Sequence, residues 1–122
     1  MPGVQKRSFD SPDETRTPAK SVVAVVTVGE VTVGRKTLEA GWRWSECIKE
    51  IAGTDDCQLH HLGVALSGRL RVTHRDGSVE DIGPGDVYVI QAGHDAWVLG
   101  DEPFVGVEFD SHTASTYATT SG

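Results

Sequence analysis

The sequence predicts an all-β fold, an antiparallel barrel of short strands, from three observations. Valine-rich runs recur along the chain, the 14 glycines separate many of them, and apolar and polar residues alternate from residue 59 to residue 109. Alternation bounded by glycine turns is typical of strands with one buried face. A chain of 122 residues is long enough for a single domain with one core.

The first 30 residues divide into an arm and a strand. Residues 1–20 contain Pro2, Pro12 and Pro18 among charged and hydroxyl side chains, which predicts a flexible N-terminal arm. Residues 21–28 form a nearly continuous apolar run, which is typical of a strand buried on both faces. Residues 31–38 predict the next strand, with Gly34 as a candidate bulge.

The segment that follows carries two of the three tryptophans. Read as a strand, residues 39–47 place Trp42 and Trp44 on one face and Cys47 on the other. Residues 49–56 predict an irregular connection.

Residues 59–67 predict a strand with two different faces. Leu62, Val64 and Leu66 share one face, and His61 shares the other with Gly63 and Ala65. Because small residues leave space beside the histidine, this second face predicts the wall of a pocket.

The remaining strands are short. Asp76-Gly77 predicts a type I′ hairpin between strands at 69–75 and 78–82. Turns at 83–86 and 92–95 separate further strands at 87–90, 96–99 and 103–109. The predicted domain therefore covers residues 21–109, and residues 110–122 predict a flexible tail.

Charge and composition exclude several classes of function. A formal net charge of -7 argues against nucleic acid as a partner. No apolar run approaches the length of a membrane span, and none resembles a signal peptide. Two cysteines outside any Cys-x-x-Cys spacing predict reduced thiols, and we expect a cytoplasmic protein without a membrane partner.

Two segments resemble the motifs of the cupin superfamily. The segment similar to the second motif reads Gly83-x-Gly85-Asp86-x5-Ala92-Gly93-His94. The first motif is matched by Gly41-x5-Cys47-x-Lys49 followed by His61-x6-Gly68. An alternative register begins at Gly53 and places Asp55 and Cys57, or Thr54 and Asp56, at the two histidine positions. In neither register is the family's set of three histidines and one glutamate complete.

The resemblance implies a double-stranded β-helix, or jelly roll, with a small-molecule site inside the barrel. His61 and His94 are the candidate acid/base groups or metal ligands, Asp95 is placed to orient His94, and Cys47 is a candidate third ligand. Because the ligand set is incomplete, the resemblance does not by itself imply a metal. The candidate cofactor is a divalent transition metal (Zn, Fe, Ni or Mn), and a metal-free site is the alternative.

The predicted substrate-binding residues are aromatic or small. Trp42, Trp44 and Trp97 provide stacking surfaces, and Gly63 and Ala65 leave room for a ligand. The same tryptophans equally suit the core or a dimer interface. We expect a homodimer, formed partly through residues 22–28 and one or more tryptophans, because an apolar strand edge is safest when it is covered.

Two functions remain open from the sequence. The first is a cupin-type enzyme, an isomerase, cyclase, lyase or oxygenase acting on an organic metabolite. The second is a ligand-binding or sensing protein without metal.

Overall fold

The computed structural model describes residues 3–57 and 60–109, which form nine strands and two short helices. The strands are β1 (Glu14–Arg16), β2 (Ser21–Val28), β3 (Val31–Leu38), β4 (His61–Ser67), β5 (Arg69–His74), β6 (Val79–Ile82), β7 (Val87–Ile90), β8 (His94–Leu99) and β9 (Phe104–Phe109). The helices are α1 (Trp44–Cys47) and α2 (Lys49–Ala52). The tail predicted for residues 110–122 lies outside the described residues.

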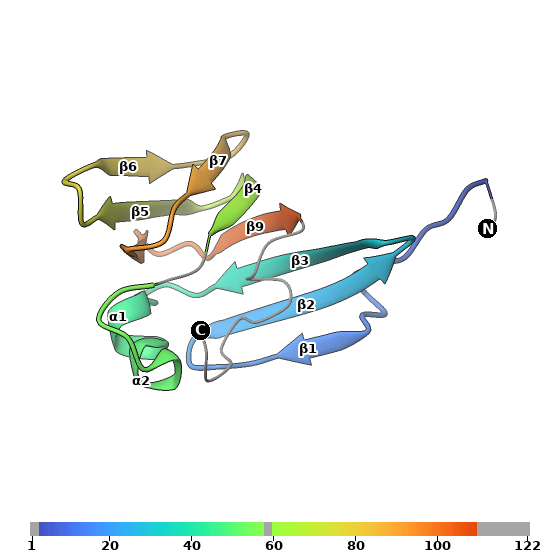
Figure 1. Ribbon diagram of the computed structural model, residues 1–122, viewed down its shortest axis with the longest axis horizontal. Helices are drawn as coiled ribbons and strands as arrows, with labels where there is room; N and C mark the ends of the chain where they lie inside the picture. The colour runs from blue at the N-terminus through green and yellow to red at the C-terminus, as the bar shows by residue number, and fades with distance from the viewer. Residues whose placement is uncertain (1–2, 58–59, 110–122) are drawn as a thin grey trace.

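The strands form two antiparallel sheets. One has six strands in the order β1-β2-β3-β9-β4-β7, and the other has three in the order β6-β5-β8. Figure 1 shows the small sheet and β7 on one side of the molecule and β1 on the opposite side. The predicted all-β class is confirmed. Within the described residues, however, the sheets do not close into a hydrogen-bonded barrel, because no pairing joins the edge strands β6 and β7.

One hydrophobic core joins both sheets and the helices. The six-stranded sheet contributes Leu38 and Phe104, the small sheet contributes Leu70, and α1 contributes Trp44. All four side chains are at most 3 % exposed. The core therefore lies between the sheets, and side chains on their facing sides point into it.

The N-terminal arm contains a strand that the sequence analysis did not predict. Residues 14–16 pair with β2 as β1 and cover the edge of that apolar strand. The Asp13 carboxylate accepts hydrogen bonds from the backbone N–H of Thr27 (2.7 Å) and from the Arg7 guanidinium (2.6 Å). Long-range contacts thus order this part of a polar, proline-containing segment.

Three local predictions need correction. The pairing of β2 with β3 continues through Gly34 without a bulge, and the irregularity in register lies between Ala65 and Ser67 of β4 instead. The turn at Gly77 is not type I′, because Asp76 lacks the positive φ that this turn requires of both central residues. The Gly77 N–H donates to the His74 carbonyl at 2.9 Å, which fits a three-residue loop ending in a left-handed glycine.

The third correction concerns residues 44–52. Residues 44–47 form a helical turn and not a strand, and α2 occupies the first half of the predicted irregular connection at 49–56. The Asp95 carboxylate accepts the backbone N–H of Ser45 at 3.1 Å, and the Arg43 guanidinium stacks on Trp97, 4.3 Å from the ring centroid. These contacts tie the start of α1 to β8. Among the described residues, no helix is long and apolar enough to cross a membrane.

Candidate functional site

Three donor side chains meet in the interior, from Cys57, His61 and His94. His61 begins β4 and His94 begins β8, while Cys57 precedes β4 and pairs with His94 through the backbone. The Cys57 N–H donates to the His94 carbonyl at 2.7 Å, and the Gly93 N–H donates to the Cys57 carbonyl at 2.6 Å. This backbone pairing brings the thiol to the two imidazoles.

The cluster is compact and buried. Cys57 Sγ lies 3.8 Å from His61 Nε2, and one ligand atom from each residue lies within 4.8 Å of the others. The two imidazole rings meet edge to face with centroids 4.9 Å apart. Each of the three residues is at most 4 % exposed.

Each imidazole is held through its Nδ1 atom. His94 Nδ1 lies 2.8 Å from the Gln91 carbonyl oxygen, and His61 Nδ1 lies 2.9 Å from Glu108 Oε1. A carbonyl oxygen only accepts, and so does an ionised carboxylate, so Nδ1 carries the proton in both rings. The lone pair of each neutral imidazole is therefore on Nε2, the nitrogen suited to binding a metal.

Burial keeps both histidines neutral. It lowers the pKa of His94 to about 3, with a further lowering from His61. Burial also lowers the pKa of His61, and this outweighs the opposing effect of the Glu108 charge. Neutral imidazole is the form that binds metals, so neither ring has to lose a proton at neutral pH.

Glu108 is the buried counter-charge of the site. Burial alone would raise the pKa of its carboxyl, but Lys36 and His61 hold that pKa well below the usual range. Lys36 Nζ lies 2.6 Å from Oε2, and the Tyr88 hydroxyl donates to the same oxygen at 2.8 Å. Burial and the Glu108 charge raise the pKa of Tyr88, so its hydroxyl stays protonated.

The donor set fits a transition metal. One cysteine sulfur and two imidazole nitrogens suit Zn, Fe or Cu, whereas Mn prefers carboxylate oxygens. Three protein ligands with one open position are typical of catalytic zinc sites. Of the metals predicted from the sequence, the residues present therefore fit Zn and Fe better than Mn.

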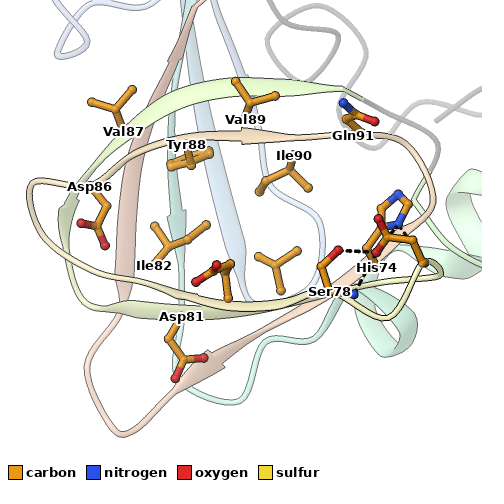
Figure 2. Close-up of a pocket in the computed structure, with 13 residues that line it drawn as sticks. His74, Ser78, Asp81, Ile82, Asp86, Val87, Tyr88, Val89, Ile90 and Gln91 are labelled. Carbon is orange, nitrogen blue, oxygen red and sulfur yellow. Dashed lines mark hydrogen bonds and ion pairs between the residues drawn. The ribbon is translucent and has the colours of Figure 1, made fainter.

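A pocket of about 600 Å³ lies between β6 and β7. Figure 2 shows Tyr88, Ile90 and Ile82 directed between the two walls, with Val87 and Val89 directed away. Ile90 is the cross-strand partner of His61, and the Gln91 carbonyl accepts from His94. Cys57, His61 and His94 are not themselves among the described lining residues, so the pocket is related to the cluster through these neighbours of the two histidines.

Comparison with solved structures identifies the fold. A Rhizobium leguminosarum protein of unknown function superposes with a TM-score of 0.62 at 19 % identity, covering 87 % of this chain and 94 % of its own. Lactobacillus farciminis oxalate decarboxylase gives 0.62 at 17 % identity, covering 89 % of this chain and 33 % of its own. A sugar phosphate isomerase of the cupin superfamily from Silicibacter pomeroyi gives 0.59 at 16 % identity, covering 85 % and 73 %.

The chain has the cupin fold. The resemblance inferred from the motifs is therefore confirmed at the level of fold. At these identities the comparison establishes the cupin architecture alone. No protein-family model matches the chain, and no curated protein matches it either.

The structure distinguishes the two registers of the first cupin motif. Cys57, from the register that starts at Gly53, lies in the cluster with His61 and His94. It precedes His61 by four residues in the sequence. Cys47 of the other register lies on α1, and the structure does not bring it into this cluster. Lys49 lies on α2, where its ammonium lies 3.8 Å from the Asp55 carboxylate.

Asp95 does not contact the His94 ring among the interactions described. Its carboxylate instead accepts from the backbone N–H groups of Ser45 and Ala96 and pairs with Arg43 at 3.2 Å. The Gln91 carbonyl takes the orienting position that the sequence analysis assigned to Asp95.

The predicted substrate-binding residues do not line the pocket between β6 and β7. Trp42 and Trp44 are buried in the core, and Trp97 is half-buried beneath Arg43. Gly63 and Ala65 face the interior as predicted, but the space beside Gly63 is filled. A Cβ atom there would lie 2.8 Å from Glu108 Cγ and 2.9 Å from the Tyr88 hydroxyl.

Sequence reasoning missed Lys36, Tyr88 and Glu108. A usable signal exists for Glu108, since strand alternation places it on the same face as Phe104 and Gly106. A single acid on an otherwise apolar or small face indicates a buried, paired carboxylate.

Proposed function

We propose that this chain is a metal-dependent enzyme that acts on a small organic molecule bound in the pocket between β6 and β7. The observation that carries the proposal is the cluster of Cys57, His61 and His94, with ligand atoms within 4.8 Å of one another. Its two imidazoles are neutral and held through Nδ1, as metal-binding histidines commonly are.

The residues have distinct roles in this proposal. Cys57, His61 and His94 would hold the metal, and Gln91 and Glu108 would orient the imidazoles. When bound, a divalent metal supplies a Lewis acid that polarises a carbonyl oxygen or activates water. Tyr88 lies on the pocket wall and stays protonated, so its hydroxyl keeps its hydrogen bond to Glu108 Oε2.

The charge of the pocket limits the substrate. Its described lining contains four carboxylates and neither lysine nor arginine. Only one of these carboxylates, that of Asp81, is paired with an arginine, Arg71 at 2.7 Å. The lining therefore favours a neutral or cationic organic molecule and disfavours a phosphorylated one. The proposal includes a reducing, cytoplasmic compartment, which keeps both cysteines as reduced thiols.

Cobalt titration tests the metal site. Metal-free protein titrated with Co²⁺ should develop a thiolate-to-cobalt absorption band at one equivalent, and the protein purified without added metal should contain a stoichiometric transition metal. Cys57→Ala should abolish the band. Cys47→Ala is the matched control and should retain it, because Cys47 lies on α1 outside the cluster.

Two results would overturn the proposal. One is a cobalt spectrum unchanged by Cys57→Ala, and the other is the absence of any binding by the intact protein. In the second case a ligand-binding protein without metal becomes the better description of the pocket.

A further inference from the structure

A cross-strand row of the six-stranded sheet holds the Glu108 carboxylate between two glycines. Gly34 of β3 and Gly63 of β4 are the register partners of Glu108 on its two sides. Tyr88 of β7 is the next residue in the row, as the partner of Gly63. A side chain at Gly63 would contact Glu108 Cγ and the Tyr88 hydroxyl at less than 3 Å. The glycine is therefore what lets Tyr88 reach the carboxylate.

Three donors from three strands converge on this carboxylate. Oε2 accepts from Lys36 Nζ at 2.6 Å and from the Tyr88 hydroxyl at 2.8 Å. Oε1 lies 2.9 Å from His61 Nδ1. Glu108 is fully buried and Lys36 is 5 % exposed, so this arrangement is enclosed by protein. Buried charges are retained when they are paired and hydrogen-bonded in this way.

The direction of these hydrogen bonds sets the tautomer of His61. A carboxylate that receives the Lys36 and Tyr88 donors acts as an acceptor toward His61 as well, so Nδ1 must donate. The lone pair of the ring is then on Nε2, which lies 3.8 Å from Cys57 Sγ. This cross-strand row thus directs the metal-binding nitrogen of His61 toward the other two candidate ligands, Cys57 and His94.

We propose that Glu108 is a positioning residue that fixes the tautomer and orientation of His61, and that Lys36 and Tyr88 hold its carboxylate in place. The inference rests on the proposed metal site, because it assigns Nε2 of His61 as a ligand. Loss of a carboxylate that orients a histidine ligand typically weakens metal binding about 10–100-fold.

Glu108→Gln replaces the acceptor that faces His61 Nδ1 with a donor, and it leaves the side-chain volume nearly unchanged. The amide has one oxygen, and Lys36 and Tyr88 both donate to the position of Oε2, so the oxygen occupies that position. The NH₂ group then faces His61 Nδ1, which must accept. The ring proton moves to Nε2, the atom that is required as the ligand.

Two measurements test the proposal. Nitrogen-15 NMR of histidine-labelled, metal-free protein should show the Nδ1–H tautomer of His61 in the parent and the Nε2–H tautomer in Glu108→Gln. Zn²⁺ affinity, measured by competition with a chromophoric chelator, should fall about 10–100-fold in the same variant. Glu30→Gln removes an exposed carboxylate outside the pocket lining and should change neither readout.

The proposal is overturned if Glu108→Gln keeps the parent tautomer and a Zn²⁺ affinity within about twofold of the parent. Should that variant fail to fold, Lys36→Met combined with Glu108→Leu removes both buried charges together. His61 should then populate both tautomers, and a single Nδ1–H tautomer would refute the positioning role. Zn²⁺ binding that survives Cys57→Ala would reject the metal site instead, and the tautomer in metal-free protein is independent of that result.

Discussion

Acidification of the metal-free protein should reduce its free energy of unfolding by about 2 kcal/mol between pH 7 and pH 5, through His94 alone. The folded protein holds the pKa of His94 at about 3, against an ordinary value of 6.5. Below pH 6.5 the unfolded chain therefore takes up a proton that the folded protein does not. Each further unit of pH costs about 1.4 kcal/mol until the pH approaches the folded pKa.

His61 acts in the same direction. Burial lowers the pKa of this ring too, so its protonation also favours the unfolded chain as the pH falls. The carboxylates with lowered pKa values, including Glu108, lose their contribution only at lower pH, since their ordinary pKa values are near 4. The interval from pH 7 to pH 5 consequently separates the effect of His61 and His94 from that of the carboxylates.

Urea unfolding in the presence of a chelator measures this dependence at pH 7, 6 and 5. His94→Gln should flatten the dependence on pH, whatever its effect at pH 7. His60→Gln is the matched control, because it makes the same substitution at an exposed position. Equal stability at pH 7 and pH 5, or a full slope in His94→Gln, would refute the reasoning.

Three further predictions concern the interior and the assembly. Gly63→Ala should cost about 1–3 kcal/mol in urea unfolding, since its Cβ would lie 2.6 Å from the Val107 carbonyl oxygen; a change below about 0.5 kcal/mol would contradict this. Lys36→Met should cost about 3–5 kcal/mol, because it leaves the Glu108 carboxylate buried without its cation, and a variant as stable as the parent would show that the charge is otherwise compensated. The predicted homodimer should appear in light scattering at micromolar concentration, and a monomer there would exclude it.

The faces of β4 could be predicted from the sequence because strand alternation is strict. His61, Gly63 and Ala65 are each buried, while Leu62 and Leu66 are 44 % and 52 % exposed. One histidine on a face of small residues is enough to predict an inward imidazole. The sequence could not predict that the space beside Gly63 is filled, because Tyr88 and Glu108 reach it from strands that are distant in sequence.

The helical turn at residues 44–47 could not be predicted for a different reason. Four residues are too few for alternation to be distinguished from helical periodicity. The start of the turn also contacts a distant strand, because the Asp95 carboxylate of β8 accepts the backbone N–H of Ser45. The tryptophans that alternation placed together on a strand face are consequently buried in the core, so neither Trp42 nor Trp44 is exposed for a dimer interface.

Spacing alone could not decide which cysteine belongs to the site, because both registers of the first motif begin at a glycine and reach a cysteine. The deciding contact is the backbone pairing of Cys57 with His94, which no local pattern encodes. That pairing places a thiol where the cupin motif has an imidazole, and the exchange changes the chemistry of the site. A sulfur ligand selects softer metals than the family's set of histidines and a glutamate, so Zn or Fe is favoured over Mn. The carboxylate that the motif would use as a ligand is absent from the start of β4, where His61 stands. Glu108 supplies a carboxylate from β9 instead, and its Oε1 lies 2.9 Å from Nδ1 of the His61 ring.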